Sequence, residues 1–164
     1  GAGIRIAMNQ SRNLTLKLAT PADAATIAAM SRELIEIGLP WSWTRERVTR
    51  NLRQPETLVL TARDSEHLAG FSIMQFGEER AHLSLLAVRP DYQRQGVGRR
   101  MLEWLTASAL TAGIASIHLE LREANLDARR FYLDQGFAET LRVPGYYRGV
   151  ETAVRMLREI RVKP

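Results

Sequence analysis

Cysteine is absent from this 164-residue chain, and lysine occurs only twice. Without cysteine the chain can form no disulfide, present no thiolate nucleophile and bind no metal through sulfur. The three histidines, His67, His82 and His118, lack the spacing of metal ligands, so we expect them to be structural and expect no metal site. No apolar run approaches the roughly 18 residues of a transmembrane helix. The N-terminal sequence also lacks a secretory signal pattern, from which we expect a cytoplasmic protein.

Positive charge is in excess, with 23 lysines and arginines against 18 acidic residues. Binding to DNA or RNA requires that such charge gather on one face. The arginines are instead scattered along the sequence, and no recognition-helix or RNA-binding motif accompanies them. We therefore do not expect nucleic acid to be the principal partner.

A glycine-containing stretch, Val88–Arg100, carries the strongest chemical signal. Leu83 to Val88 predicts a buried strand, and Gly96 and Gly98 then open a helical pattern that continues through Leu105. The first amides of a helix have no partner within the helix, and the helix dipole adds partial positive charge there. Glycine lets an anion approach those amides. The stretch predicts a site for a phosphorylated ligand.

The spacing narrows the kind of ligand. No Gly-x-x-x-x-Gly-Lys-Ser/Thr run is present, and Met101 stands where a dinucleotide fingerprint needs its third glycine. What is present is Gln-x-x-Gly-x-Gly, on Gln93, Gly96 and Gly98. This spacing resembles the pyrophosphate loop of the GNAT superfamily of acetyl-CoA-dependent N-acetyltransferases. Taken alone, it is also compatible with a glycine turn kept for packing.

A second signature follows about 25 residues later. Ser116–Leu121 alternates as a strand, Asn125 is placed to cap a helix, and Gly136 is placed to end it. The pattern Leu-Glu-Leu-Arg-x-x-Asn-x-x-Ala-x-x-x-Tyr-x-x-x-Gly-Phe resembles the second motif of the same superfamily. Both motifs occur in the expected order, which makes coincidence a poor explanation.

Within the superfamily, the chain is most similar to the branch that acetylates the N-terminal alanine of ribosomal proteins. The similarity runs from Leu14 to Ile160 and is carried by Pro90–Gly96, Leu119–Arg122, Pro40-Trp41-Ser42 and the pair Tyr146-Tyr147. Two departures stand out. Pro144-Gly145 replaces an Arg-Asn pair usual in that branch, and the stretch from Tyr147 to Glu151 is shorter.

The order of elements predicts a single α/β (α+β) domain over residues 14–164, with residues 1–13 as a flexible N-terminal segment. The resemblance implies a mixed, mostly antiparallel sheet whose central strands splay apart and whose faces are covered by helices. We expect strands at 14–18, 57–63, 68–76, 80–88, 116–121, 138–142 and 152–159, and helices at 21–37, 44–54, from 97 onward and at 125–135.

The resemblance also implies how acetyl-CoA, the co-substrate, is held. Its pantetheine arm would pair with the free edge of the fourth strand as an added strand. Its pyrophosphate would lie on the amides of the glycine loop. The cofactor-binding residues implied are Leu86, Ala87 and Val88 on the strand, Gln93, Arg94, Gln95, Gly96, Val97, Gly98 and Arg99 in the loop, and Asn125.

Two residues of the second motif are the candidate catalytic groups. Glu120 would accept the proton of the amine through water, and we expect partial burial to raise its pKa. Its alternative role is a surface carboxylate paired with Arg122 or His118. Tyr132 would protonate the leaving thiolate; its alternative role is a core aromatic. A backbone amide near Val88 would stabilise the oxyanion.

The acceptor amine should bind between two loops, 38–44 and 142–151. They contribute the candidate substrate-binding residues Trp41, Tyr146 and Tyr147. They contain no acid before Glu151 but do contain Arg142 and Arg148, which disfavours polyamines.

Three functions remain open. The first is acetylation of a protein or peptide N-terminus. The second is acetylation of a small neutral or carboxylate-bearing amine, favoured by the departures above. The third is a CoA-binding regulatory module without turnover. The sequence does not indicate an oligomeric state.

Overall fold

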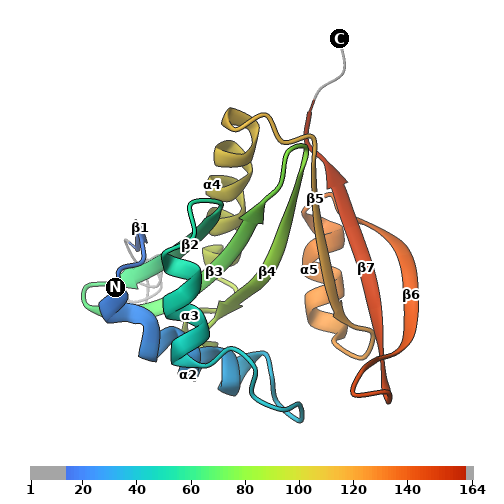
Figure 1. Cartoon of the computed structure of the whole chain (residues 1–164), viewed down its shortest axis with the longest axis horizontal. Coiled ribbons are helices and arrows are strands. Elements are labelled where there is room, and N and C mark those ends of the chain that lie inside the picture. The colour runs from blue at the N-terminus through green and yellow to red at the C-terminus, as the bar shows by residue number, and fades with distance from the viewer. Residues whose placement is uncertain (1–13, 162–164) are drawn as a thin grey trace, which may run out of the picture.

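The computed structural model describes residues 14–161, so the predicted flexible segment 1–13 lies outside the described residues. Seven strands form one sheet, with helices on both of its faces (Figure 1). The strands are β1 (Thr15–Leu18), β2 (Thr57–Asp64), β3 (His67–Phe76), β4 (Arg80–Val88), β5 (Ser116–Arg122), β6 (Ala138–Tyr147) and β7 (Glu151–Glu159). The helices are the 3-10 turns η1 (Pro21–Asp23) and η2 (Pro90–Tyr92) and the α-helices α2 (Ala24–Leu34), α3 (Arg45–Leu52), α4 (Val97–Thr111) and α5 (Leu126–Asp134).

The strand order is β1-β2-β3-β4-β5-β7-β6, and every neighbouring pair is antiparallel except β4 and β5. The parallel pair lies at the centre of the sheet, where the crossover through α4 connects it. The predicted mixed, mostly antiparallel sheet is thereby confirmed.

Helices cover the two faces of the sheet unequally. On one face, α4 and α5 pack on a core that draws residues from most of the strands, among them Leu60, Leu83, Leu119 and Met156. On the other face, α2 and α3 pack on β2, β3 and β4, and no residue of β5, β6 or β7 belongs to that second core cluster. The face of β5 that carries Glu120 is therefore not covered by an apolar helix layer.

Local sequence explains most of the helix boundaries. The Thr44 hydroxyl accepts a hydrogen bond from the Arg47 amide at 3.3 Å, and Asn125 Oδ1 accepts one from the Ala128 amide at 3.1 Å, so each residue caps its helix. The end of α2 differs from the prediction, which extended it to Ile37. The amide of Glu36 bonds to the Ser31 carbonyl at 2.8 Å, five residues back, and this closes the helix at Leu34.

The prediction that β6 ends at Arg142 is also wrong. The strand continues to Tyr147, with a register irregularity between Val143 and Tyr147. Pro144 is tolerated because β6 is an edge strand, where the missing N–H of proline costs no ladder hydrogen bond. The predicted loop 142–151 is thus reduced to the three residues between β6 and β7, and the tyrosine pair lies at a strand end.

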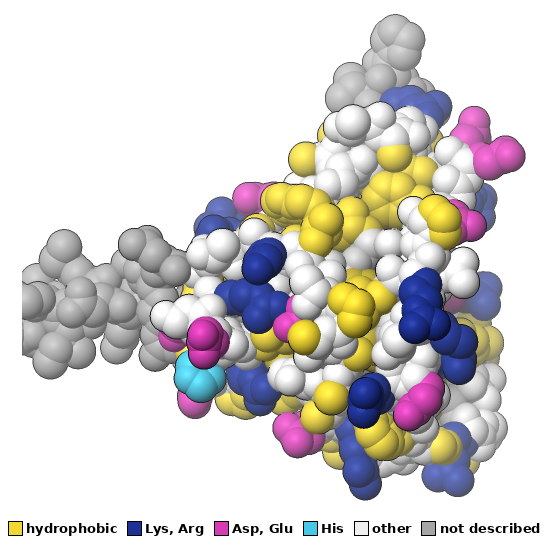
Figure 2. All heavy atoms as spheres, turned by 60° about the vertical axis from the view of Figure 1, so that its left-hand side comes forward, with side chains coloured by type: hydrophobic (Ala, Val, Ile, Leu, Met, Phe, Trp, Pro, Cys, Tyr) yellow, Lys and Arg dark blue, Asp and Glu magenta, His cyan; other side chains and the backbone are white. Residues whose placement is uncertain are grey.

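None of the helices within residues 14–161 combines the length and hydropathy of a membrane span. On the face shown in Figure 2, basic side chains are interspersed with acidic and apolar ones, so that view presents no continuous basic stripe.

Candidate active site

The two central strands separate along their length. In the described sheet, β4 and β5 pair over Arg80–His82 and Ser116–His118 and then diverge (Figure 1). The Arg89 amide donates to the Ala69 carbonyl at 2.8 Å, so the odd-numbered residues at this end of β4 direct their backbone groups toward β3.

Because of this alternation, the three strand residues predicted to bind the cofactor do not all direct their backbone groups to the same side. The backbone groups of Leu86 and Val88 face the gap between β4 and β5, whereas those of Ala87 face β3. The Val88 carbonyl accepts a hydrogen bond from Gln93 Nε2 at 2.9 Å, which places the start of the glycine loop over the open edge. The gap therefore presents backbone groups of two of the three predicted residues.

The glycine loop turns sharply into α4. Arg94 and Gly96 both have positive φ angles, 62° and 78°. The Arg100 amide donates to the Gly96 carbonyl at 2.9 Å, which leaves the amides of Val97, Gly98 and Arg99 without partners in the helix. The predicted concentration of free amides at this helix N-terminus is present.

Close packing explains the second glycine of this loop. A Cβ atom on Gly98 would lie 3.3 Å from Cζ of Phe131 in α5 and 3.7 Å from Leu86 of β4. Gly98 therefore lets α4, α5 and the open strand edge meet at one point. In the same loop, Gln95 Oε1 is buried without a hydrogen-bond partner among the described residues.

Glu120 lies between two basic side chains. Its Oε2 atom pairs with Nε2 of His82, and its Oε1 atom lies 3.6 Å from Nε of Arg155. The hydrogen bond from His82 lowers the pKa of Glu120 and, with the positive charges nearby, outweighs burial. The prediction that its pKa would be raised is wrong, because sequence spacing did not show that His82 lies beside it. The alternative pairing with Arg122 or His118 is also not what the described residues form.

His82 is the site residue that sequence reasoning missed, since the prediction made all three histidines structural. In the parallel register of β4 and β5, His82 lies opposite His118, two residues before Glu120. Its Nδ1 atom lies 3.3 Å from Ser84 Oγ, which donates in turn to Gln75 Oε1 at 3.4 Å. A chain of polar groups therefore leads from Glu120 to the exposed side of β3.

Tyr132 is buried in the core of the α4–α5 layer, with 8% of its surface exposed. Its ring packs edge-on against Phe131 and Phe137, with centroid distances of 5.0 and 5.5 Å. Within the described residues its hydroxyl makes no hydrogen bond, and burial raises its pKa well above the ordinary value. The hydroxyl therefore stays protonated and is available as a donor.

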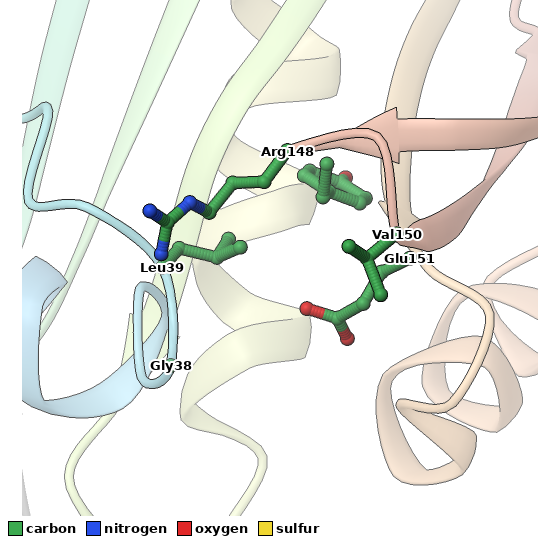
Figure 3. A pocket seen from close by; sticks show the side chains of 6 residues that line it. Gly38, Leu39, Arg148, Val150 and Glu151 are labelled. Carbon is green, nitrogen blue, oxygen red and sulfur yellow. The ribbon is translucent and has the colours of Figure 1, made fainter.

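A cavity of about 340 Å³ opens between the α2–α3 loop and the β6–β7 turn. Figure 3 shows the Arg148 side chain reaching from that turn toward Leu39 of the opposite loop. The lining residues are Gly38, Leu39, Tyr147, Arg148, Val150 and Glu151. Burial raises the pKa of Tyr147, which lines the cavity, to about 12, and the negative charges of Tyr146 and Glu120 contribute to this shift.

The chain matches the acetyltransferase (GNAT) family over residues 28–137. It belongs to the GNAT family. A ribosomal protein bS18-alanine N-acetyltransferase of Escherichia coli is 35% identical over 108 residues, which is 66% of this chain and 71% of that protein. The corresponding protein of Salmonella typhimurium is 39% identical over 102 residues, covering 60% and 68%.

Solved structures agree with the family assignment. The E. coli ribosomal-protein-alanine N-acetyltransferase superposes with a TM-score of 0.80 at 29% identity, covering 92% of this chain and 96% of that one. An aminoglycoside 6'-N-acetyltransferase bound to coenzyme A has a TM-score of 0.76 at 18% identity, covering 92% and 99%, and shows the fold alone. This GNAT chain is accordingly an acetyl-CoA-dependent N-acetyltransferase, and acetyl-CoA is its co-substrate.

The residues present fit that co-substrate. The free amides at the start of α4 suit a pyrophosphate, and the open edge of β4 suits the amides of a pantetheine arm. The unpartnered Gln95 oxygen is a further acceptor at the same loop. Asn125 caps α5 through its side chain, so its role toward the cofactor stays a prediction. No cluster of potential metal ligands occurs among residues 14–161.

Two residues predicted to face the acceptor do not line the cavity. The Trp41 indole donates to the Ala28 carbonyl at 3.2 Å and stacks under Arg32 at 5.1 Å, so Trp41 lies against α2 and does not line the cavity. From this loop, Gly38 and Leu39 line the cavity. Tyr146 is 45% exposed and packs edge-on against Tyr147 at 4.9 Å, so it adjoins the cavity without lining it.

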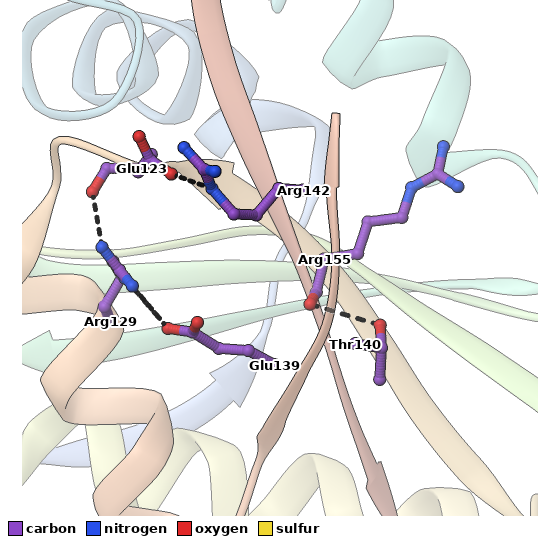
Figure 4. Close-up of polar contacts among 6 residues, drawn as sticks. All are labelled: Glu123, Arg129, Glu139, Thr140, Arg142 and Arg155. Carbon is purple, nitrogen blue, oxygen red and sulfur yellow. Dashed lines mark hydrogen bonds and ion pairs between the residues drawn. The ribbon is translucent and has the colours of Figure 1, made fainter. Parts of the chain in front are cut away.

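Arg142 is likewise not a free cation near the acceptor. It pairs with Glu123 at the β5–α5 turn (Figure 4). Arg129 of α5 bonds to Glu139 at 2.8 Å and to the Glu123 carbonyl at 3.2 Å in the same network. These contacts fix α5, and with it Tyr132, against the edge strand β6. The premise that Arg142 is uncompensated is therefore wrong, and of the two arginines Arg148 lines the cavity; the poor turnover of polyamines stays a prediction.

Proposed function

We propose that this enzyme acetylates the N-terminal α-amine of a protein or peptide. The observation that carries the proposal is the cavity between the α2–α3 loop and the β6–β7 turn. Four of its six lining residues, Gly38, Leu39, Tyr147 and Val150, present backbone or apolar and aromatic groups, which suit a peptide terminus with a small side chain, and Arg148 and Glu151 complete the lining. The curated relatives at 35–39% identity, which are ribosomal protein bS18-alanine N-acetyltransferases, support the same substrate class.

Acetyl-CoA supplies an activated acetyl thioester to the site. In this proposal the backbone groups of Leu86 and Val88 hold its pantetheine arm, and the amides of Val97, Gly98 and Arg99 hold its pyrophosphate. The gap between β4 and β5 then directs the thioester toward Glu120 on one side and Tyr132 on the other. A free backbone amide on this stretch of β4 is the candidate donor to the developing oxyanion.

The acceptor must lose a proton before it attacks, because the α-amine of an unstructured peptide has a pKa of about 7.7–8.0. We assign this proton to Glu120 acting together with His82. The lowered pKa of Glu120 makes its carboxylate a weak base alone, whereas the adjoining imidazole can accept through one nitrogen and donate through the other. Ser84 Oγ lies beside the second ring nitrogen of His82, and Gln75 Oε1 accepts a hydrogen bond from that hydroxyl, so both side chains orient the imidazole.

Tyr132 completes the proposed chemistry as the proton donor to the leaving thiolate. Its burial keeps the hydroxyl protonated, and the absence of a partner for it among the described residues leaves its proton free for a ligand atom. Direct attack by the amine suffices, since the chain has no cysteine to form an acyl-enzyme.

A second candidate substrate is a small amine that carries a carboxylate. Arg148 lines the cavity and has no ion-pair partner among the described residues, so it can bind an anionic group there. The Pro144-Gly145 pair and the short β6–β7 turn distinguish this chain from the ribosomal-protein branch at the same place.

An acceptor panel tests the proposal. Purified enzyme is incubated with acetyl-CoA and with peptides that begin with different residues, free amino acids, aminoglycosides or spermidine, and thiol release is followed with a thiol-reactive dye. Because the enzyme has no cysteine, the dye reports only free CoA and any thiol of the acceptor. We expect peptides with small N-terminal residues to give the highest kcat/KM. Preferential turnover of free amino acids would favour the second candidate, and preferential turnover of spermidine would overturn both.

A further inference from the structure

We propose that Glu36, a buried carboxylate outside the catalytic pair, is a positioning residue that shapes the acceptor side of the cavity. It does so by holding the α2–α3 loop, residues 35–44, in the conformation that brings Leu39 to the cavity wall. The proposal rests on the proposed function only in taking this cavity as the acceptor site.

The Glu36 carboxylate accepts hydrogen bonds from several donors of its own loop and from α2. Only 6% of its surface is exposed. Its Oε1 atom accepts from both the amide and the hydroxyl of Ser42 at 2.7 Å, and its Oε2 atom accepts from the Ser31 hydroxyl at 2.8 Å. The amide of Trp43 completes the set at 3.3 Å. The carboxylate therefore fastens the far end of the loop, Ser42–Trp43, back onto α2.

The charge of Glu36 is maintained inside the protein. Burial raises its pKa, but the hydrogen bonds from Ser42, Ser31 and Trp43 together outweigh burial and leave the pKa below its ordinary value. Hydrogen bonds to an ionised acceptor are about twice as strong as those between neutral groups. The ionised Glu36 therefore holds Ser42 and Trp43 more strongly than a neutral amide would, and an aliphatic side chain at this position could not accept these hydrogen bonds at all.

The near end of the loop has a separate attachment. Arg122 Nη2 of β5 donates to the Ile35 carbonyl at 3.1 Å, and Nη1 of the same side chain lies 3.9 Å from Glu151 Oε2. Glu151 lines the opposite wall of the cavity (Figure 3). Arg122 therefore connects the two walls through one guanidinium.

Between these attachments the loop reverses direction at Gly38, whose φ is +79°. The Leu39 amide bonds to the Glu36 carbonyl at 2.9 Å. Leu39 is thus placed by a turn whose two ends are fixed by Arg122 and by the carboxylate of Glu36. Loss of the carboxylate frees the Ser42 end, and the cavity wall at Leu39 shifts without any change at the glycine loop that serves acetyl-CoA.

The test is a comparison of Michaelis constants in Glu36→Gln, with Glu33→Gln as its matched control. The substitution is isosteric, but it removes the charge and turns a donor toward the Ser42 and Trp43 donors. We expect the KM for the best acceptor of the wild-type enzyme to rise about tenfold, with the KM for acetyl-CoA and kcat changed by about twofold or less. Glu33 is an exposed residue of α2, three positions before Glu36, so its variant should match the wild type.

Thermal unfolding of each variant accompanies the kinetics. If Glu36→Gln does not fold, Ser42→Ala removes one donor and keeps the carboxylate, and a rise of about threefold in acceptor KM alone is expected. Equal changes in both KM values, or an unchanged acceptor KM in a folded variant, would overturn the proposal. Since the assay uses whichever amine the wild-type enzyme acetylates best, failure of the peptide hypothesis leaves this test intact.

Discussion

Replacing Tyr132 by phenylalanine should lower kcat strongly while leaving the fold intact. Both expectations follow from the surroundings of the Tyr132 hydroxyl. The ring contacts with Phe131 and Phe137 persist in the variant. No hydrogen bond is lost, because the hydroxyl has no partner within the described residues. Removing a hydroxyl that makes no hydrogen bond to the rest of the protein is close to neutral for stability.

The two expected magnitudes differ widely. The free energy of unfolding should change by less than about 1 kcal/mol, which for a chain of this length corresponds to less than about 4 °C in Tm. A general acid contributes about 10²–10⁴-fold to the rate. The loss of kcat should therefore correspond to roughly 3–5 kcal/mol of transition-state stabilisation.

The measurement pairs thiol-release kinetics with thermal unfolding of the same preparation, and Tyr92→Phe serves as the control. The Tyr92 hydroxyl donates to Asp64 at 2.7 Å, so its removal should lower the free energy of unfolding by about 1–2 kcal/mol while most of kcat remains. A Tyr132→Phe enzyme with kcat within about twofold of the wild type would show that another group protonates the thiolate. A Tm fall larger than that of Tyr92→Phe would show that the Tyr132 hydroxyl stabilises the fold.

Further predictions concern the cofactor, the base, the acceptor and acid stability. Acetyl-CoA at 100 times its Kd should stabilise the fold by about 2.7 kcal/mol and raise Tm by several degrees in thermal unfolding, with ATP and NAD without effect; a shift by those nucleotides alone would contradict the assignment. His82→Ala removes the hydrogen bond that lowers the pKa of Glu120, so the acidic limb of the kcat/KM profile should move to higher pH, whereas Glu120→Gln should lower the rate about 10²–10⁴-fold; unchanged profiles in both would place the base elsewhere. Tyr146→Ala should raise the KM for the acceptor more than that for acetyl-CoA, and the reverse order would move the acceptor site. The lowered pKa values of Asp23 and Glu36 imply stability that is present above their ordinary values of 3.8 and 4.5 and is lost as pH falls below them; denaturant unfolding between pH 6 and pH 3 should show this loss, smaller in Glu36→Gln.

Short-range sequence patterns were sufficient to predict the glycine loop and the order of helices and strands. The glycine spacing after Val88, the capping residues Thr44 and Asn125, and the alternation in β5 each depend on residues within a few positions of one another. Backbone conformation and hydrogen bonding at that range follow from local sterics and from which side chains can reach the nearest free amides. These features of the fold could therefore be predicted without knowing how the strands pair.

The tertiary structure decided which side chains face one another across the sheet. An extra residue in β4, opposite the step from Ile73 to Met74, interrupts the alternation of that strand, and the parallel register then brings His82 to Glu120. This contact reverses the expected direction of the pKa of Glu120. Neither the register nor the irregularity is encoded within one segment, because both depend on how separate strands fit together.

The same reason explains why some predicted acceptor residues do not line the cavity. Trp41 and Arg142 have the right chemistry and the right place in the chain, but long-range partners, Ala28 and Glu123, hold their side chains away from the cavity. Sequence alone indicated the family, and it singled out the glycine loop and the two motif residues Glu120 and Tyr132, whose roles stay predictions. The walls of the cavity depend on the tertiary structure, because hydrogen bonds between groups far apart in the chain, on α2, β5, β6 and β7, hold those walls in place.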